Sequence, residues 1–202
     1  MQKISYRLPT EERQSEIIAA VLQLAAKNNP ASITTADIAS ELNLTQGAVF
    51  KHFPTKNAML LAAMSWVESN LLSAMELAAR KPDSPIAGLR AAFMAHVKFV
   101  MAHPGVPRLI FQDMQQPDDT PLKGSVRGLL ARYSKLVVSQ LEEAEKQGEI
   151  APGLDKAAAV LLFVGAIQGL VFQSMLAGGA DRMAVEAKRV FALYLQGVGA
   201  RT

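Results

Sequence analysis

Apolar residues recur at helical spacing through nearly the whole of this 202-residue chain, and no segment shows the alternation of a β-strand. Sequences such as "NNP", "KPDSP", "HPG" and "QPDDTP" interrupt the pattern. The spacing predicts an all-α fold with about nine helices. Their expected ranges are about 11–27, 34–43, 46–52, 56–80, 86–103, 106–115, 122–148, 154–177 and 181–197.

Local signals define the first helix boundaries. Thr34 is a suitable N-cap, and Asp37 follows three residues later, where a carboxylate favours a helix N-terminus. Asn43 tolerates the left-handed conformation that ends many helices. Phe53 precedes Pro54, and a residue before proline avoids helical geometry. We therefore expect two short helices joined by a tight turn over residues 34–53.

Composition narrows the chemistry. Half of the residues are hydrophobic, enough for one sizeable core or a small domain beside a larger one. Cysteine is absent, which excludes disulfides, thiolate chemistry and cysteine metal sites. The first residues lack the apolar stretch of a secretory signal, and the most apolar segment, 157–172, is too short to span a membrane. The net charge of +3 permits a nucleic-acid partner without arguing for one.

The segment "NLTQGAVFKHF" places Gly47 inside a short helix, where glycine costs about 1 kcal/mol relative to alanine. Two short helices form a helix-turn-helix pattern when the second begins with small and polar residues. In that motif the second helix enters the DNA major groove. Small Gly47 and Ala48 would let the backbone approach closely. Gln46 can pair with adenine, and Thr45 can offer its hydroxyl to a phosphate. A plain helical hairpin inside an all-helical core is the alternative.

The stretch "TTADIASELNLTQGAVFKHFPTKNAML" resembles the signature of the tetracycline-repressor (TetR-like) family of bacterial transcription factors. Two positions depart from the family pattern near the second short helix: Phe50 stands where a tyrosine is usual, and Asn43 replaces a turn glycine. Ala36 occupies a position where many members carry a basic residue. The matching residues are Thr34, Ile38-Ala39, Asn43-Leu44, Gly47-Ala48, Val49-Phe50, His52-Phe53 and Lys56.

The resemblance implies a DNA-binding domain over 1–56 and an effector-binding and dimerisation domain over 57–202. It also implies phosphate contacts from basic residues at the end of the second short helix and the start of the next. Lys3 and Arg7, on the N-terminal arm, could add to them; ordinary solvated surface residues are the alternative for all these cations. The expected DNA-binding set is Thr34, Thr45, Gln46, Gly47, Ala48, Phe50, Lys51, His52 and Lys56.

The helix over 154–177 is apolar on nearly every side, which one neighbouring helix cannot bury. Its small residues would allow a close helix–helix approach. The resemblance implies that this helix and the next pair with their copies in a four-helix bundle; a central core helix of a monomer is the alternative. The expected interface set is Leu161, Gly165, Gln168, Gly169, Phe172, Val190 and Tyr194.

The resemblance further implies a small-molecule pocket among the later helices. Its mostly apolar candidate lining favours an uncharged or hydrophobic effector. Each member could instead be ordinary core, and His96 could be a satisfied core histidine. The candidates are Trp66, Phe93, His96, Phe99, Val100, Phe111, Met114, Tyr133, Phe163 and Gln168.

Together these features predict a cytoplasmic transcriptional repressor that binds a palindromic double-stranded DNA operator as a homodimer and is released by an effector. No cofactor is expected. An enzyme is disfavoured, because no nucleophile–base set, Gly-rich phosphate loop or HExxH spacing occurs. His96 and His103, with Asp113, leave a metal site as a minor alternative. An all-helical adaptor that binds neither DNA nor ligand is the other alternative.

Overall fold

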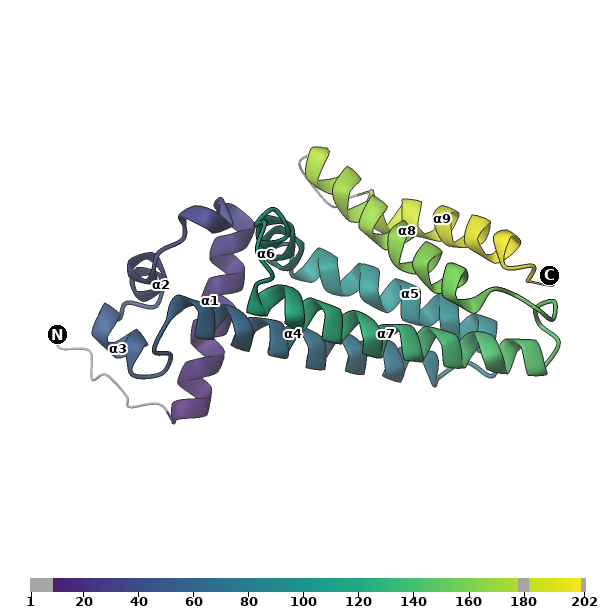
Figure 1. The fold of residues 1–202 in the computed structure, drawn as a ribbon, viewed down its shortest axis with the longest axis horizontal. Coiled ribbons are helices and arrows are strands. Elements are labelled where there is room, and N and C mark those ends of the chain that lie inside the picture. Colours follow the sequence, from purple (N-terminus) through teal and green to yellow (C-terminus); the bar gives the residue numbers. More distant parts are fainter. Residues whose placement is uncertain (1–8, 178–181, 201–202) are drawn as a thin grey trace. The chain divides into compact units, whose positions relative to one another are not determined.

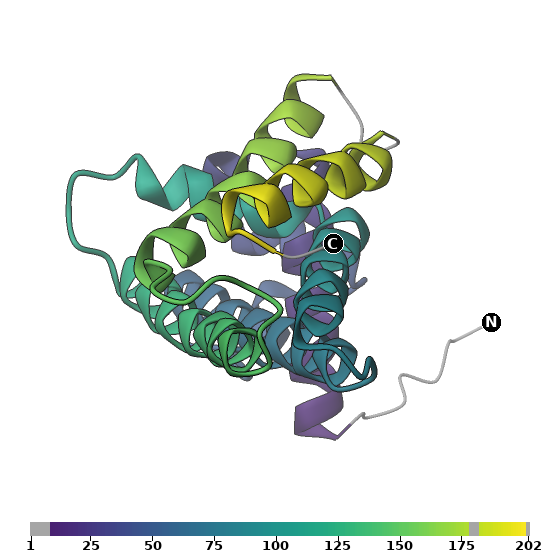
Figure 2. The ribbon, with the colours of Figure 1, turned by 90° about the vertical axis from the view of Figure 1, so that its right-hand side faces the viewer.

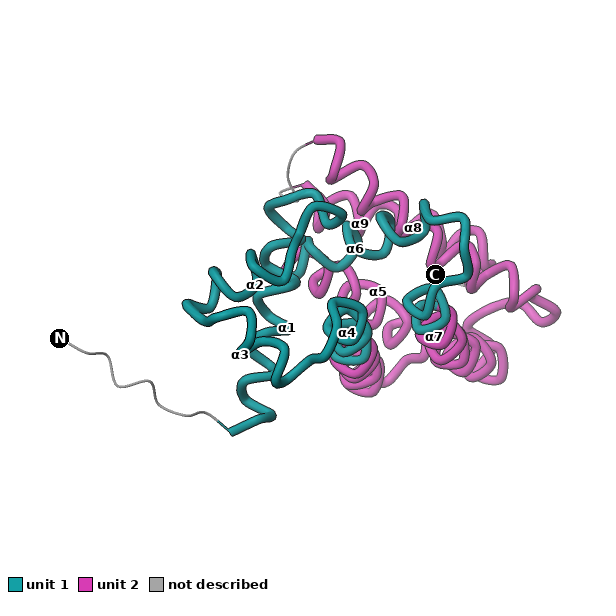
Figure 3. Tube along the Cα trace, turned by 60° about the vertical axis from the view of Figure 1, so that its left-hand side comes forward, with its two compact units in different colours: residues 1–67, 103–126 teal, residues 68–102, 127–202 magenta. Residues whose placement is uncertain are grey.

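The computed structural model describes residues 9–177 and 182–200, in which the regular elements are nine α-helices and one 3₁₀ helix (Figure 1). The expected all-α class is confirmed. The chain divides into two compact units, residues 1–67 with 103–126 and residues 68–102 with 127–202 (Figure 3). The predicted boundary after residue 56 remains a prediction.

The first unit gathers the short N-terminal helices. It holds α1 (Thr10–Lys27), the 3₁₀ helix η1 (Pro30–Ser32), α2 (Thr35–Glu41), α3 (Gln46–Phe50), α6 (Gly105–Met114) and the beginnings of α4 (Lys56–Ala79) and α7 (Pro121–Lys146). Ile17, Val21 and Leu24 are buried on the inner face of α1, as their spacing predicts. Helix α6 lies tightly against α1, because a Cβ on Gly105 would come within 2.0 Å of the Leu22 carbonyl oxygen.

Side-chain caps and one left-handed residue fix the turn between α2 and α3. Thr34 forms a capping box with Asp37 at the start of α2, as expected. Asn43 has a φ of 54°, so it adopts the left-handed conformation that its residue type allows. The Leu44 amide then donates to the Ala39 carbonyl at 2.8 Å, and Thr45 becomes the N-cap of α3. The short helix pair is therefore encoded locally.

The second unit is built on an aromatic core. It contains α5 (Pro85–Ala102), α8 (Lys156–Leu176), α9 (Met183–Gly197) and the remainders of α4 and α7. Helices α8 and α9 lie side by side (Figures 1 and 2). Phe163 of α8 meets Phe93 of α5 edge to face, with ring centroids 5.1 Å apart. Phe191 and Tyr194 of α9 complete this buried cluster.

The predicted helices match those of the structure within a few residues, with two differences. The 3₁₀ helix η1 begins at Pro30 of "NNP", where only a break was expected, because Asn29 caps it by accepting the Ala31 amide. Helix α3 ends at Phe50 rather than at about residue 52. The expected start of the last helix at about residue 181, and the arm with Lys3 and Arg7, lie outside the described residues.

By length and composition alone, α4 and α8 could each cross a membrane, so the expectation that the apolar segment 157–172 is too short does not hold for the whole of α8. About 39% of the most apolar window of each helix is buried inside the chain. Core helices of water-soluble proteins share this length and composition, so these two properties do not separate the two settings. Length and composition therefore do not tell what covers the exposed apolar part of α8.

Candidate nucleic-acid interface

One face of α3 is open and the other closes the small N-terminal core. Gln46, Gly47, Phe50 and Lys51 are exposed, whereas Val49 is completely buried. Positions four apart lie on the same side of a helix, so the exposed residues form a single outward face. This arrangement is the one that the helix-turn-helix pattern predicts.

The surroundings of Gly47 show that its small size is not needed for packing inside the protein. A Cβ added there would meet no atom of the described residues within 4 Å. Internal packing therefore gives no reason for glycine at this position, although glycine weakens the helix by about 1 kcal/mol relative to alanine. The open space lies outside the protein, where a close-fitting partner would benefit from a missing side chain.

The two threonines of the motif differ in what they can still bond. Thr45 accepts the Ala48 amide at 3.2 Å, which leaves its hydroxyl proton free to donate. Thr34 accepts the Asp37 amide and also donates to the Asp37 carboxylate at 2.7 Å. That hydroxyl bond is the main reason that the pKa of Asp37 lies below its usual value. The Thr34 hydroxyl therefore has no proton left to donate in the DNA contact that had been expected of it. Its side chain serves as a helix cap.

The three basic residues expected at the phosphates occupy different environments. Lys51 is exposed, and His52 is half-buried with its ring Nδ1 unpartnered and its carbonyl accepting from Gln14. Lys56 is half-buried and its ammonium donates to the Ile33 carbonyl. The Lys56 side chain therefore links the start of α4 to the segment before α2. Of these three basic side chains, only Lys51 is classed as exposed in the described part of the chain.

Four of the expected pocket residues come together in the second unit. Phe93 and Tyr133 are nearly inaccessible, and Tyr133 donates to or accepts from His96 Nδ1 at 2.9 Å. Phe163 packs on both Phe93 and Tyr133. Loss of solvent lowers the pKa of His96 to about 4 and raises that of Tyr133, so both are neutral near pH 7. The cluster is an apolar core with one polar pair.

Other expected pocket residues are elsewhere. Val100 and Phe99 are buried on α5, while Trp66 and Phe111 belong to the first unit, where Trp66 meets His103 edge to face at 5.1 Å. Two expectations need correction. Met114 is 58% exposed at the end of α6, and Gln168 is exposed on the outer face of α8. Met114 belongs to the first unit, and Gln168 does not face the aromatic cluster of its own unit, because α8 turns another side toward that core.

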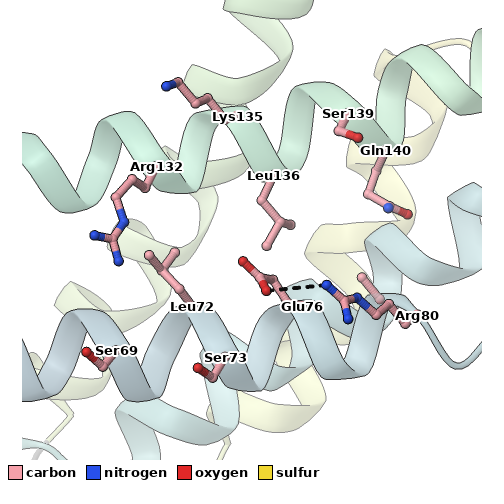
Figure 4. A pocket seen from close by; sticks show the side chains of 11 residues that line it. Ser69, Leu72, Ser73, Glu76, Arg80, Arg132, Lys135, Leu136, Ser139 and Gln140 are labelled. Atoms are coloured by element: carbon pink, nitrogen blue, oxygen red, sulfur yellow. Dashed lines mark ion pairs between the residues drawn. The ribbon is translucent and has the colours of Figure 1, made fainter.

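Sequence reasoning did not identify a polar groove of about 590 Å³ between α4 and α7 in the second unit (Figure 4). The spacing of Ser69, Ser73, Glu76 and Arg80 along one face of α4 was the available signal. The charges in and beside the groove are largely paired internally, Glu76 with Arg80 at 3.7 Å and Glu68 with Arg132 at 3.2 Å. It does not match the apolar lining expected of an effector pocket.

The outer face of α8 is strongly apolar. Leu161, Phe172 and Leu176 are 75%, 55% and 69% exposed, and Leu193 of α9 is 67% exposed. Among the expected interface residues, Gly165, Gln168 and Gly169 share the exposure of Leu161 and Phe172, and Val190 is half-buried. Each of the two glycines has open space where a Cβ would stand.

Tyr194 does not belong to that outer face, contrary to expectation. It is 3% exposed and packs between Phe163 and Phe191, and its hydroxyl has no hydrogen-bond partner. The helical spacing that places Tyr194 near Val190 also turns its ring toward α8. Burial raises its pKa, so the hydroxyl stays protonated.

Comparison with known proteins agrees with the helix-turn-helix geometry. Residues 17–63 match the family model of bacterial regulatory proteins of the tetR family. Over these residues the chain resembles the N-terminal, DNA-binding part of tetR-family regulators.

The relatives agree along most of the chain. Nucleoid occlusion factor SlmA from Shewanella baltica is 24% identical over 165 residues, which are 82% of this chain and 84% of the relative. The solved fatty acid degradation regulator FadR from Bacillus halodurans has a TM-score of 0.84, 18% identity and coverage of 98% and 100%. FadR from Bacillus subtilis, solved with stearoyl-CoA, has a TM-score of 0.80, 18% identity and coverage of 91% and 98%.

The His96 environment predicts a pH dependence of stability. The folded state binds fewer protons than the unfolded state between pH 4 and 6.5, so the free energy of unfolding falls as the pH drops through this range. His96→Gln keeps a hydrogen-bond partner for Tyr133 and removes the titration. Between pH 7 and pH 5, the free energy of unfolding measured with urea should fall by about 1–2 kcal/mol more for the original protein than for the variant. Equal losses would contradict the burial argument.

Proposed function

We propose that this protein is a transcriptional repressor that binds a two-fold-related DNA operator as a homodimer and acts in the bacterial cytoplasm. The outward face of α3 is the observation that carries the proposal. Its exposed Gly47 is not required by packing among the described residues, and polar Gln46 and basic Lys51 lie on the same face. A helix with such a face fits the major groove, where backbone proximity and a base-pairing amide are both needed.

Each residue of the face has a distinct role in this proposal. Gln46 reads a base edge, for which adenine offers a matching donor and acceptor. The Thr45 hydroxyl and the Lys51 ammonium contact phosphates, which position the helix and make binding salt-dependent. Gly47 and Ala48 keep the backbone close to the groove. His52 has a half-buried ring and Lys56 a bond to Ile33, so we assign them a supporting role.

The outer face of α8 and α9 supplies the dimer interface in this proposal. Exposed apolar side chains cost stability in water, and covering them contributes about 25 cal/mol per Å² of buried area. Leu161 and Phe172 of each protomer would contact the partner, with Gly165 and Gly169 allowing the helices to approach closely. A two-fold pair of subunits matches a palindromic operator. This pairing also gives a reason for the exposed apolar surface of α8 other than a bilayer.

The aromatic cluster of the second unit is the place we propose for the effector. Phe93, Tyr133 and Phe163 offer apolar contacts, and the neutral His96–Tyr133 pair can exchange hydrogen bonds with a ligand. None of these side chains is charged near pH 7, so an uncharged, mainly hydrophobic molecule fits better than an ion. The structure of the Bacillus subtilis relative, solved with stearoyl-CoA, supports a ligand-binding role for this fold.

In this proposal, release from DNA follows from thermodynamic linkage between effector binding and DNA binding. An effector that binds one conformation better shifts the population toward it, whereas equal affinity for both changes nothing. Helix α4 contributes residues to both units, from Lys56 to Val67 in one and from Glu68 to Ala79 in the other. It is therefore the element through which we propose that effector binding alters the separation of the two α3 helices.

The alternative is an all-helical adaptor that binds no DNA. It predicts no retardation of DNA at low salt, whereas a regulator gives a steep decrease of affinity with salt and prefers a palindrome. The next three experiments separate these functions and their parts.

Gly47→Leu tests the DNA-binding face. Leucine places a side chain in the space that the groove would occupy, so binding to a fragment flanking the protein's own gene should weaken at least tenfold in a gel shift. The melting temperature should stay the same or rise slightly, because leucine favours helix more than glycine. Gly128→Leu, another helical glycine with open space around it, is the matched control. Equal binding by both variants would refute the role of Gly47.

Leu161→Glu tests the dimer interface. A carboxylate at a position to be buried between subunits costs several kcal/mol, so the dimer should dissociate at least tenfold more readily in sedimentation equilibrium. Leu77→Glu places the same charge on an exposed leucine of α4, 62% exposed, and should leave the dimer intact. If Leu161→Glu also remains a dimer of normal affinity, the α8 face is not the interface.

A panel of small molecules tests the effector class. Uncharged apolar compounds, such as long-chain alcohols and neutral steroids, should release the retarded DNA fragment more effectively than their carboxylate analogues. The reason is that burying an uncompensated charge in the aromatic cluster is costly. Release by the carboxylates alone, at comparable concentration, would contradict the proposed site.

A further inference from the structure

Phe50 is an exposed aromatic on a face that otherwise carries polar and small residues. In residues 9–177 and 182–200 only two aromatic side chains are exposed, Phe50 at 44% and Phe172 at 55%. Phe172 lies on the apolar outer face of α8, where exposed neighbours share its character. Phe50 has no such apolar surroundings on α3, where Gln46, Gly47 and Lys51 are its exposed neighbours.

The geometry of α3 keeps the Phe50 ring outside. The inner positions of this segment are filled by Val49 and Phe53, which are 0% and 7% exposed. Phe50 stands four residues after Gln46, hence one turn along the same face. Gln46 is the residue proposed to pair with a base edge. If Gln46 reads a base edge as proposed, the ring of Phe50 would lie in the same groove beside it.

The chemistry of the ring limits what it can read. Phenylalanine has no hydroxyl or amide, so Phe50 cannot donate a hydrogen bond to a phosphate or a base. Base edges in the major groove carry donors and acceptors, with one apolar exception, the C5-methyl group of thymine. Covering that methyl and the ring together removes apolar surface from water, which is favourable by about 0.8 kcal/mol for a methyl-sized group.

We propose that Phe50 is a specificity-determining residue that contacts the C5-methyl group of a thymine in each operator half-site. This inference rests on the proposed DNA-binding function and adds to it the identity of one base. The smaller apolar groups of the face are less suited to the task. The Ala48 side chain is half-buried, and the Thr45 side chain is held by its bond to the Ala48 amide.

Replacing thymine by uracil tests the contact, because the two bases differ only by the C5-methyl group. A retarded fragment from the region flanking the gene is amplified with dTTP or with dUTP, and both duplexes are titrated against the original protein and Phe50→Ala. The original protein should bind the uracil duplex about fourfold more weakly, or more if several thymines are contacted. The ratio of the affinities for the thymine and uracil duplexes should be at least about fourfold smaller for Phe50→Ala than for the original protein.

Two further variants separate base reading from general binding. Phe50→Tyr keeps the ring and should retain the thymine preference. Lys51→Ala should weaken binding to both duplexes equally, because a phosphate contact is independent of the base. Unchanged melting temperatures would show that Phe50→Ala folds normally, as its exposure predicts.

The outcomes distinguish this inference from the function on which it rests. Binding of thymine and uracil duplexes with equal affinity, or an undiminished thymine preference in Phe50→Ala, would overturn the role of Phe50 and leave DNA binding intact. Failure of the original protein to retard either duplex at low salt would overturn the proposed function itself, and the inference with it.

Discussion

The fixed orientation of a five-residue helix is the constraint on which the other features depend. Helix α3 is too short to be stable alone, because nucleating a helix costs more than its few hydrogen bonds return. Asn43 supplies the left-handed turn, Thr45 caps the first turn, and Val49 fixes the inner side in the core. With these three points set, the rotation of α3 is determined, and so is the set of side chains that faces outward.

The outward faces of the two units pose different physical problems. On α3, the small and polar residues cost little in water, but Gly47 lowers helix stability, which the proposed DNA partner would explain. On α8, Leu161 and Phe172 leave apolar area in water, which the proposed second copy would cover. A dimer on DNA would complete both together, which is why one proposed function accounts for two unrelated features.

Local signals made most of the fold and the α3 face predictable. Thr34 with Asp37 and the positive φ of Asn43 depend on neighbours in the sequence, and both were expected correctly. Properties that depend on distant residues were not. The bond from Lys56 to Ile33, the inward rotation of Tyr194 and the groove lined by α4 and α7 need the packed structure. Helical spacing gives the faces of each helix but not the partner that each face meets.

Methylation protection on a bound fragment is the most direct measurement of the central claim, that the outward face of α3 lies in the major groove. Dimethyl sulfate modifies guanine N7 in the major groove and adenine N3 in the minor groove. The account predicts two protected major-groove patches, related by a two-fold axis and centred about one helical turn or a multiple of it apart. Protection confined to the minor groove, or a single patch without a two-fold mate, would contradict it.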